Sequence, residues 1–256
     1  MRFGERLSAA VAEHGPLCVG IDPHSELLSD WGLTDDAGGV QRFCRTVVDA
    51  LAGEVALIKP QSAFFERHGS RGVAALEALL ADARAAGILV LLDVKRGDIG
   101  STMGGYAQAY LGAGSPLSAD AITVSPYLGF GSLDPALELA AKNGRGVFVL
   151  ARTSNPEGAS IQEARAGDRS VAQTVVDEVA ARNAGLEPLG DVGVVVGATG
   201  EYDLDLSGLN GAVLAPGLGA QGATPADIAA RFTRVGGIVV PTASRSVLRH
   251  GPPAAG

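Results

Sequence analysis

The stretch LLDVKRGDIGST (91–102) places Asp93, Lys95 and Asp98 within six residues, directly at the end of a hydrophobic run. Residues 93 and 95 are two apart, so their side chains are expected to leave a strand on the same side. A lysine between carboxylates is held as an ammonium ion, because nearby negative charge favours the charged form. Such a cation can stabilise developing negative charge and donate a proton. The structural alternative is a solvated ion-pair cluster that only caps the fold.

Short aliphatic runs recur along the chain and predict the strands that position this cluster. They cover 16–22, 54–60, 87–94, 120–126, 146–152, 191–197, 211–217 and 236–241. Each run is nearly continuous in hydrophobic residues, as expected of parallel strands that are buried on both faces. The segments between them, such as 71–87 and 170–185, carry helical spacing and end in glycine. This alternation predicts a single (β/α)8 barrel domain over residues 1–256, with an open doubly wound sheet as the alternative.

Polar residues follow the predicted strands, where the reacting groups of such barrels are found. Asp22 ends the first strand and Lys59 the second, and we expect Lys59 to add a second cation opposite Asp93. A turn residue or helix cap explains any one of these positions. Six predicted strands, however, end in charged or glycine-rich residues, at Asp22, Lys59, 93–95, 153–158, 216–222 and 241–246, and their convergence on one rim predicts a site.

The last two strand exits are typical of a phosphate-binding site. In PGLGAQG (216–222), Gly217 and Gly219 allow backbone N–H groups to approach an anion, and Gln221 can extend toward the rest of a ligand. In the final segment, Arg245 can bind phosphate through two parallel hydrogen bonds.

Composition limits the classes of partner. The net charge of −8 argues against a general nucleic-acid or anionic-membrane surface, and the 46% hydrophobic content supports a large core. The two cysteines, Cys18 and Cys44, predict small buried side chains rather than a disulfide framework. No signal peptide or membrane-spanning run is evident, so we expect a cytoplasmic protein.

The motif LLDVKRGDIGST resembles the Asp-x-Lys-x-x-Asp signature of the orotidine 5′-phosphate decarboxylases, in their longer bacterial branch. The segments VGIDP, LIKPQSAFFE, TSNPEG, APGLGAQG and ASRS follow in the matching order, so the resemblance covers essentially the whole barrel. It implies decarboxylation of orotidine 5′-monophosphate to UMP, the last step of de novo pyrimidine synthesis, with no cofactor and no metal ion.

The resemblance also implies roles for individual residues. Lys95 would protonate C6 of the pyrimidine, Asp93 would lie beside the departing carboxylate, and Lys59 would link Asp93 to the ribose. The resemblance implies a homodimer in which Asp98 and Thr102 enter the partner subunit's site. The remaining substrate-binding positions would contact the ribose (Asp22), the base (Ser154 and Pro216) and the phosphate end (Gly217, Gln221, Ser244 and Arg245). Ser244 is a departure, since relatives often have glycine there.

Three alternatives share parts of this pattern. A Mg²⁺-dependent sugar-phosphate decarboxylase or aldolase would carry an acidic ligand where this chain has Lys59, whose ammonium would repel the metal. A Schiff-base aldolase needs a neutral lysine, which the carboxylates beside Lys95 disfavour. A non-catalytic nucleotide-binding barrel would bind UMP without turnover.

Overall fold

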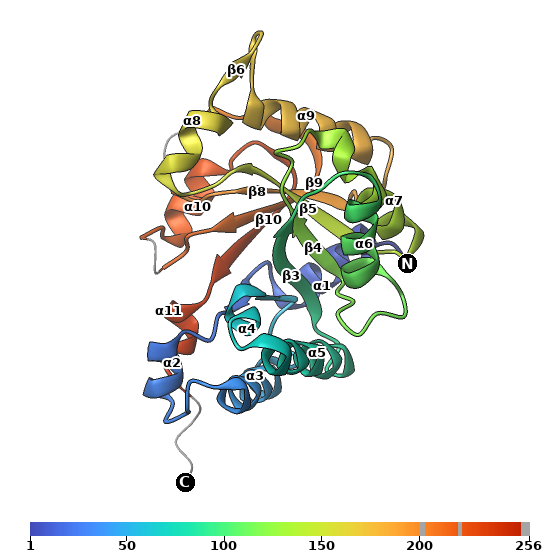
Figure 1. The fold of residues 1–256 in the computed structure, drawn as a ribbon. Helices are drawn as coiled ribbons and strands as arrows, with labels where there is room; N and C mark the ends of the chain where they lie inside the picture. The colour runs from blue at the N-terminus through green and yellow to red at the C-terminus, as the bar shows by residue number, and fades with distance from the viewer. Residues whose placement is uncertain (200–202, 220–221, 252–256) are drawn as a thin grey trace.

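Eight parallel strands close into a barrel in the computed structural model, which describes residues 1–199, 203–219 and 222–251 (Figure 1). Around the barrel the strands follow the order β1-β10-β9-β8-β5-β4-β3-β2. The closed sheet confirms the predicted (β/α)8 architecture and excludes the open sheet. The strands are β1 (Cys18–Ile21), β2 (Leu57–Pro60), β3 (Leu89–Arg96), β4 (Ala121–Val124), β5 (Gly146–Arg152), β8 (Val192–Val196), β9 (Leu206–Pro216) and β10 (Val235–Ala243).

Helices lie between the strands and cover the outside of the barrel (Figure 1). Side-chain caps fix where several of them begin: Asp36 accepts a hydrogen bond from the Gly39 backbone N–H at 2.7 Å, and Ser170 caps its helix by accepting from Gln173. The helices are α1 (Phe3–His14), α2 (Ser25–Asp30), α3 (Ala37–Leu51), α4 (Ala63–Glu66), α5 (Gly69–Ala85), α6 (Gly100–Leu111), α7 (Asp134–Lys142), α8 (Ala159–Gln162), α9 (Val171–Asn183), α10 (Pro225–Arg231) and α11 (Arg245–Leu248). Thus α5 and α9 confirm the two predicted helices, with shifted ends.

The core has two layers because each strand is buried on both faces. Side chains such as Val90, Leu92 and Ile122 face the surrounding helices. Others, including Leu57, Leu91 and Phe148, fill the barrel interior. Continuous burial of this kind is the reason that the strands appear in the sequence as unbroken hydrophobic runs.

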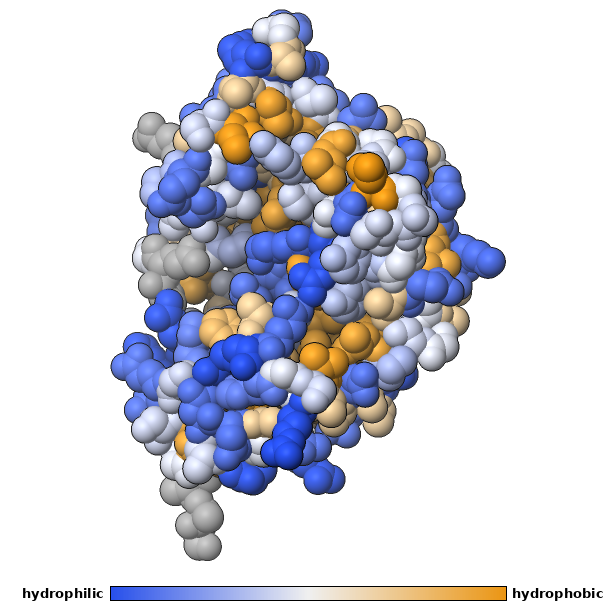
Figure 2. Space-filling model, viewed as in Figure 1, coloured by the Kyte–Doolittle hydropathy of each residue, from blue (hydrophilic) through white to orange (hydrophobic). Residues whose placement is uncertain are grey.

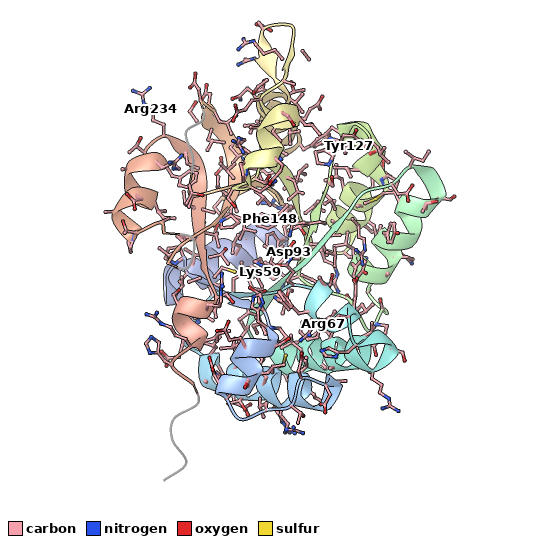
Figure 3. All side chains as sticks on the ribbon, turned by 60° about the vertical axis from the view of Figure 1, so that its left-hand side comes forward. Lys59, Arg67, Asp93, Tyr127, Phe148 and Arg234 are labelled. Carbon is pink, nitrogen blue, oxygen red and sulfur yellow. The ribbon has the colours of Figure 1, made fainter. Side chains whose placement is uncertain are left out.

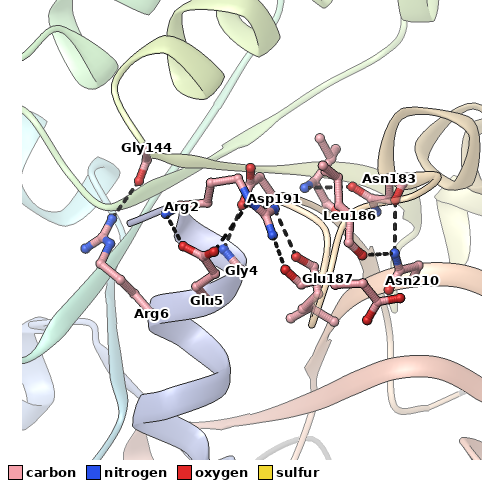
Figure 4. Close-up of polar contacts among 12 residues, drawn as sticks. Arg2, Gly4, Glu5, Arg6, Gly144, Asn183, Leu186, Glu187, Asp191 and Asn210 are labelled. Atoms are coloured by element: carbon pink, nitrogen blue, oxygen red, sulfur yellow. Dashed lines mark hydrogen bonds and ion pairs between the residues drawn. The ribbon is translucent and has the colours of Figure 1, made fainter.

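Helix α1 closes the end of the barrel opposite the strand exits. The Phe3 ring packs edge-on against Phe148, with centroids 6.0 Å apart. The backbone N–H of Gly4 donates to Asp191 Oδ1 at 2.8 Å, and Arg6 donates to the carbonyl of Gly144 at 2.9 Å (Figure 4). Phe3 and Leu7 of α1 are therefore buried together with the side chains that fill the barrel interior.

Some local features differ from the sequence-based expectation. Strand β9 begins at Leu206, five residues before the predicted start, and the loop after β5 contains a two-stranded hairpin, β6 (Arg165–Ala166) with β7 (Arg169–Ser170). Cys18 and Cys44 are free and buried, as predicted. No helix within the described residues is long and apolar enough to cross a membrane. The cytoplasmic location remains a prediction.

Candidate active site

A cavity of about 610 Å³ opens at the carboxyl ends of the strands. Its walls come from nearly every strand exit, so segments that are distant in the sequence meet there. Figure 2 shows this face of the molecule with hydrophobic patches around a hydrophilic centre. The predicted site residues that line the cavity are Asp22, Lys59, Asp93, Lys95, Ser154, Pro216, Gly217, Ser244 and Arg245.

Asp93 forms the centre of a charged cluster with two lysines. Lys95 Nζ lies 2.7 Å from both carboxylate oxygens of Asp93, and Lys59 Nζ lies 3.3 Å from Oδ2. Asp93 and Lys59 are buried, whereas the Lys95 side chain is 45% exposed at the cavity. Figure 3 shows Lys59 and Asp93 close together near the middle of the barrel. The predicted meeting of these three charges is therefore confirmed.

The backbone at Lys95 is not that of a regular strand. Its φ of +45° is unusual for a residue other than glycine, and the pairing of β3 with β4 shifts register between Leu92 and Arg96. Thr123 stabilises this bulge: its hydroxyl accepts from the Lys95 backbone N–H at 2.9 Å and donates to Asp93 Oδ1 at 2.7 Å. The alternation of side chains along a strand thus predicted the contact between Lys95 and Asp93 correctly. It did not predict the bulge that directs Lys95 toward Asp93.

The electrostatics hold Asp93 and Lys59 in their charged forms. Burial by itself would raise the pKa of the Asp93 carboxyl, but the two ammonium groups and the Thr123 hydroxyl outweigh it and lower the pKa to about 2. Burial likewise opposes the charge on Lys59, yet the carboxylates of Asp93 and Asp22 raise its pKa above the usual value. The cluster presents two cations for one central anion.

Asp98 and Thr102 do not line this cavity within one chain. Asp98 Oδ1 accepts from the backbone N–H of Ile99 at 2.8 Å, and Thr102 is exposed on α6. Within a single chain, the expectation that Lys95 lies between two carboxylates is wrong: Asp93 alone forms an ion pair with it among the described residues. Asp98 lies in the segment between the end of β3 at Arg96 and the start of α6 at Gly100.

The loops after β9 and β10 form the far end of the cavity. Gly217 has a φ of +123° and Gly219 a φ of +77°, conformations that favour glycine. Gly217 lines the cavity, but Gly219 does not, and the Gly219 N–H donates to the carbonyl oxygen of Ala223 at 2.9 Å. The expectation that the Gly219 N–H faces an anion is therefore wrong within this chain. Ser244 has a φ of −124°, so its position does not require glycine. Arg245 begins α11 and is exposed. Gln221 lies outside the described residues.

Several cavity groups were not predicted from the sequence. Thr123 and Thr242 are buried threonines of β4 and β10, and His24 lies at the rim with its ring 4.3 Å from that of Phe64. The oxygens Asp22 Oδ1, Thr242 Oγ1 and Ser244 Oγ are buried and, within the described part of the chain, accept or donate no hydrogen bond. Strand register could have placed the threonines on the barrel axis, but a threonine in a strand is too common to indicate a site.

The loop after β5 contributes a further wall that contains Ser154. Gln162 accepts from the backbone N–H of Thr153 at 2.9 Å and donates to its hydroxyl at 2.8 Å. A side chain at Gly197 would approach Ser154 within 2.9 Å, so glycine there permits the close packing of β8 against this loop. Gln162 and Thr153 line the cavity as well.

Within the described residues, no group of three or more His, Cys, Asp or Glu side chains is arranged to hold a metal ion. The cavity instead combines a lysine–aspartate–lysine cluster with Gly217 of the loop after β9 and with an arginine. A closed barrel with such a site at its strand exits has the architecture of a barrel enzyme that acts on an anionic substrate.

Comparisons with known proteins specify the family. The model of the orotidine 5′-phosphate decarboxylase / HUMPS family matches residues 15–256, and the chain belongs to this family. Orotidine 5′-phosphate decarboxylases of Streptomyces coelicolor and Salinispora arenicola are 61% and 62% identical to it, and each alignment covers 98% of this chain and 91% of the relative. A crystal structure of a Streptomyces avermitilis protein assigned to the same activity superposes with a TM-score of 0.92 at 61% identity, covering 98% of this chain and 89% of the other.

Proposed function

We propose that this chain is a single catalytic barrel that decarboxylates orotidine 5′-monophosphate to UMP, without a metal ion or cofactor. The observation that carries the proposal is the cluster in which Lys95 Nζ lies 2.7 Å from Asp93 and faces the cavity. Membership of the family supports orotidine 5′-monophosphate as the substrate. The proposed reaction is the last step of de novo pyrimidine synthesis.

The chemistry requires a fixed cation where negative charge appears. When the bond between C6 and the carboxylate breaks, CO2 leaves and its bonding electrons remain on C6, in the plane of the ring. The Lys95 ammonium stabilises this charge and transfers one proton to C6, and the lysine then regains a proton from solvent. Because the interaction strengthens as charge develops, it favours the transition state over the bound substrate.

The other residues bind and orient the nucleotide. Lys59 links Asp93 to the ribose, and the buried Asp22 oxygen accepts from a ribose hydroxyl. Ser154 and Pro216 contact the base. The phosphate is held by Gly217, Ser244 and Arg245, with Gln221 beside it. Binding energy at the phosphate, remote from the bond that breaks, can position the ring.

We also infer that the enzyme is a homodimer in which Asp98 and Thr102 complete the partner's site. Large hydrophobic side chains are exposed beside Asp98: Ile99 is 62%, Tyr127 76% and Leu128 52% exposed. These side chains belong to the loops that follow β3 and β4. The two loops are adjacent, because the Ser125 backbone N–H donates to the carbonyl oxygen of Arg96 at 2.8 Å. A second copy that covers this surface would remove it from water and bring Asp98 to a second cavity.

Mixed dimers test this arrangement directly. Lys95→Ala and Asp98→Ala subunits should each be inactive alone. After unfolding and random reassociation, half of the dimers contain both kinds of subunit, and each has one site with native Lys95 and native Asp98. The mixture should therefore recover roughly a quarter of the wild-type activity. No recovery in dimers that are shown by native mass spectrometry to have mixed would contradict the shared site.

The function itself is tested by the ultraviolet absorbance change on loss of orotidine 5′-monophosphate, with and without EDTA. We expect turnover that EDTA leaves unchanged, because the Lys59 ammonium lies where a Mg²⁺ ligand would be needed. Activity that disappears on chelation and returns with Mg²⁺ would favour a metal-dependent sugar-phosphate enzyme. Tight UMP binding without turnover would favour the non-catalytic barrel, and trapping of a carbonyl substrate by borohydride would favour a Schiff-base aldolase.

A further inference from the structure

Arg67 follows α4 and connects three loops beside the cavity (Figure 3). Its Nη2 donates to the carbonyl oxygen of Pro23 at 3.1 Å, and its Nη1 donates to Ser25 Oγ at 3.3 Å. Both nitrogens pair with the Asp35 carboxylate, at 2.5 and 3.0 Å. Its Nε donates to the carbonyl oxygen of Phe64 at 3.4 Å. One guanidinium therefore fixes the loop after β1 to the loops before α3 and after α4.

The residues beside these contacts line the cavity, although Arg67 itself does not. Pro23 lies between Asp22 and His24, both of which line the cavity. Phe64 lines it too and contacts the His24 ring. A shift of the Pro23 carbonyl would consequently move Asp22, whose buried Oδ1 has no hydrogen-bond partner within the described residues.

We propose that Arg67 is a positioning residue that holds Asp22 and His24 in the geometry required to bind the ribose of the nucleotide. This inference rests on the proposed function for its substrate. This positioning role requires the several N–H donors of a guanidinium, because the same side chain contacts a carbonyl, a hydroxyl and both oxygens of a carboxylate.

The ion pair with Asp35 has the properties of a surface link rather than of a core contact. Hydrogen bonds from Arg67, and to a lesser extent from Ser25, lower the pKa of the Asp35 carboxyl, so this carboxyl is charged at neutral pH. The two side chains are 33% and 36% exposed, and exposed pairs contribute little to the stability of a fold. Loss of Arg67 should therefore affect substrate binding more than unfolding.

The chain offers a matched control for this separation. Arg182 and Asp134 form an ion pair at 2.6 Å with 40% and 41% exposure, and neither residue lines the cavity. We expect Arg67→Ala to raise the KM for orotidine 5′-monophosphate and the Kd for UMP about tenfold, as for the loss of one hydrogen bond from a charged donor. Arg182→Ala should leave both unchanged, and the two variants should have similar melting temperatures. Arg67→Lys should recover only part of the affinity because lysine lacks the fork.

A double-mutant cycle shows whether Arg67 acts through Asp22. In an Asp22→Ala background, Arg67→Ala should change the Kd for UMP less than about twofold, because the group that it positions is absent. Equal tenfold effects in both backgrounds, or no effect of Arg67→Ala in the wild type, would overturn the proposal. Asp35→Asn provides a second variant of the same link if Arg67→Ala fails to fold, and it should raise the Kd in the same direction.

Amide hydrogen exchange of residues 22–25 gives a readout that needs no activity. Exchange there should accelerate in Arg67→Ala and not in Arg182→Ala. If the wild type turns over no orotidine 5′-monophosphate, but exchange still accelerates in Arg67→Ala, the proposed substrate is refuted and the positioning role is retained. Unchanged exchange in an active enzyme would refute the positioning role alone.

Discussion

Thr123→Val should separate the effect of the buried hydroxyl from that of side-chain shape. Thr123 is 1% exposed and makes two hydrogen bonds, to Asp93 Oδ1 at 2.7 Å and from the Lys95 backbone N–H at 2.9 Å. Valine has nearly the same volume but makes neither bond. A hydrogen bond to a charged group is worth about 1.5–3 kcal/mol, and an unpaired buried N–H adds to the loss, so we expect the free energy of unfolding to fall by about 2–4 kcal/mol.

The activity should fall as well, because Thr123 holds the bulge that directs Lys95 to Asp93. If the 1.5–3 kcal/mol of one bond is lost in the transition state, kcat/KM falls about 10- to 150-fold. Thr123→Ser is the control: it keeps the hydroxyl, loses one methyl group worth about 0.8 kcal/mol in stability, and should stay near the wild-type rate. Urea unfolding and the ultraviolet assay measure the two effects. A loss in the serine variant with none in the valine variant would show that the methyl group, not the hydroxyl, matters.

Three further variants test the charged groups. Lys95→Ala should abolish decarboxylation, whereas a cooperative melt and an unchanged oligomeric state should remain, because Lys59 still pairs with Asp93; near-normal turnover would exclude Lys95 as the proton donor. Arg245→Ala should mainly raise the Kd for UMP, about 10- to 100-fold, since in the proposed function the exposed guanidinium holds a phosphate remote from C6; an effect on kcat alone would contradict this. Asp93 has its pKa lowered from 3.8 to about 2, so its charge stabilises the native state above pH 3.8, by about 2 kcal/mol, and this contribution is lost as the pH falls through 2. Asp93→Asn should accordingly weaken the pH dependence of unfolding between pH 4 and 2, and an unchanged slope would show that this carboxyl has an ordinary pKa.

The fold was predictable from the sequence because burial on both faces leaves a continuous signal. Runs such as Leu89–Leu92 and Val147–Val149 admit few interpretations other than buried parallel strands, and the helical segments between them require right-handed crossovers. The rule that reacting groups follow the strand ends then placed Lys59, Asp93 and Lys95 at one rim. The hairpin of β6 and β7 was not predicted, because strands of two residues leave no periodic pattern.

The sequence by itself determined the barrel, the identity of the charged residues and their location at the strand exits, since these depend on local hydrophobicity and order along the chain. Only the tertiary structure decided which groups touch. It placed Thr123 between Asp93 and the Lys95 backbone, paired Asp98 with the Ile99 backbone N–H, and joined Arg67 to the loop that carries Asp22. These contacts depend on the register of neighbouring strands, a bulge and the packing of separate loops, and none of these is fixed by the residues of a single segment.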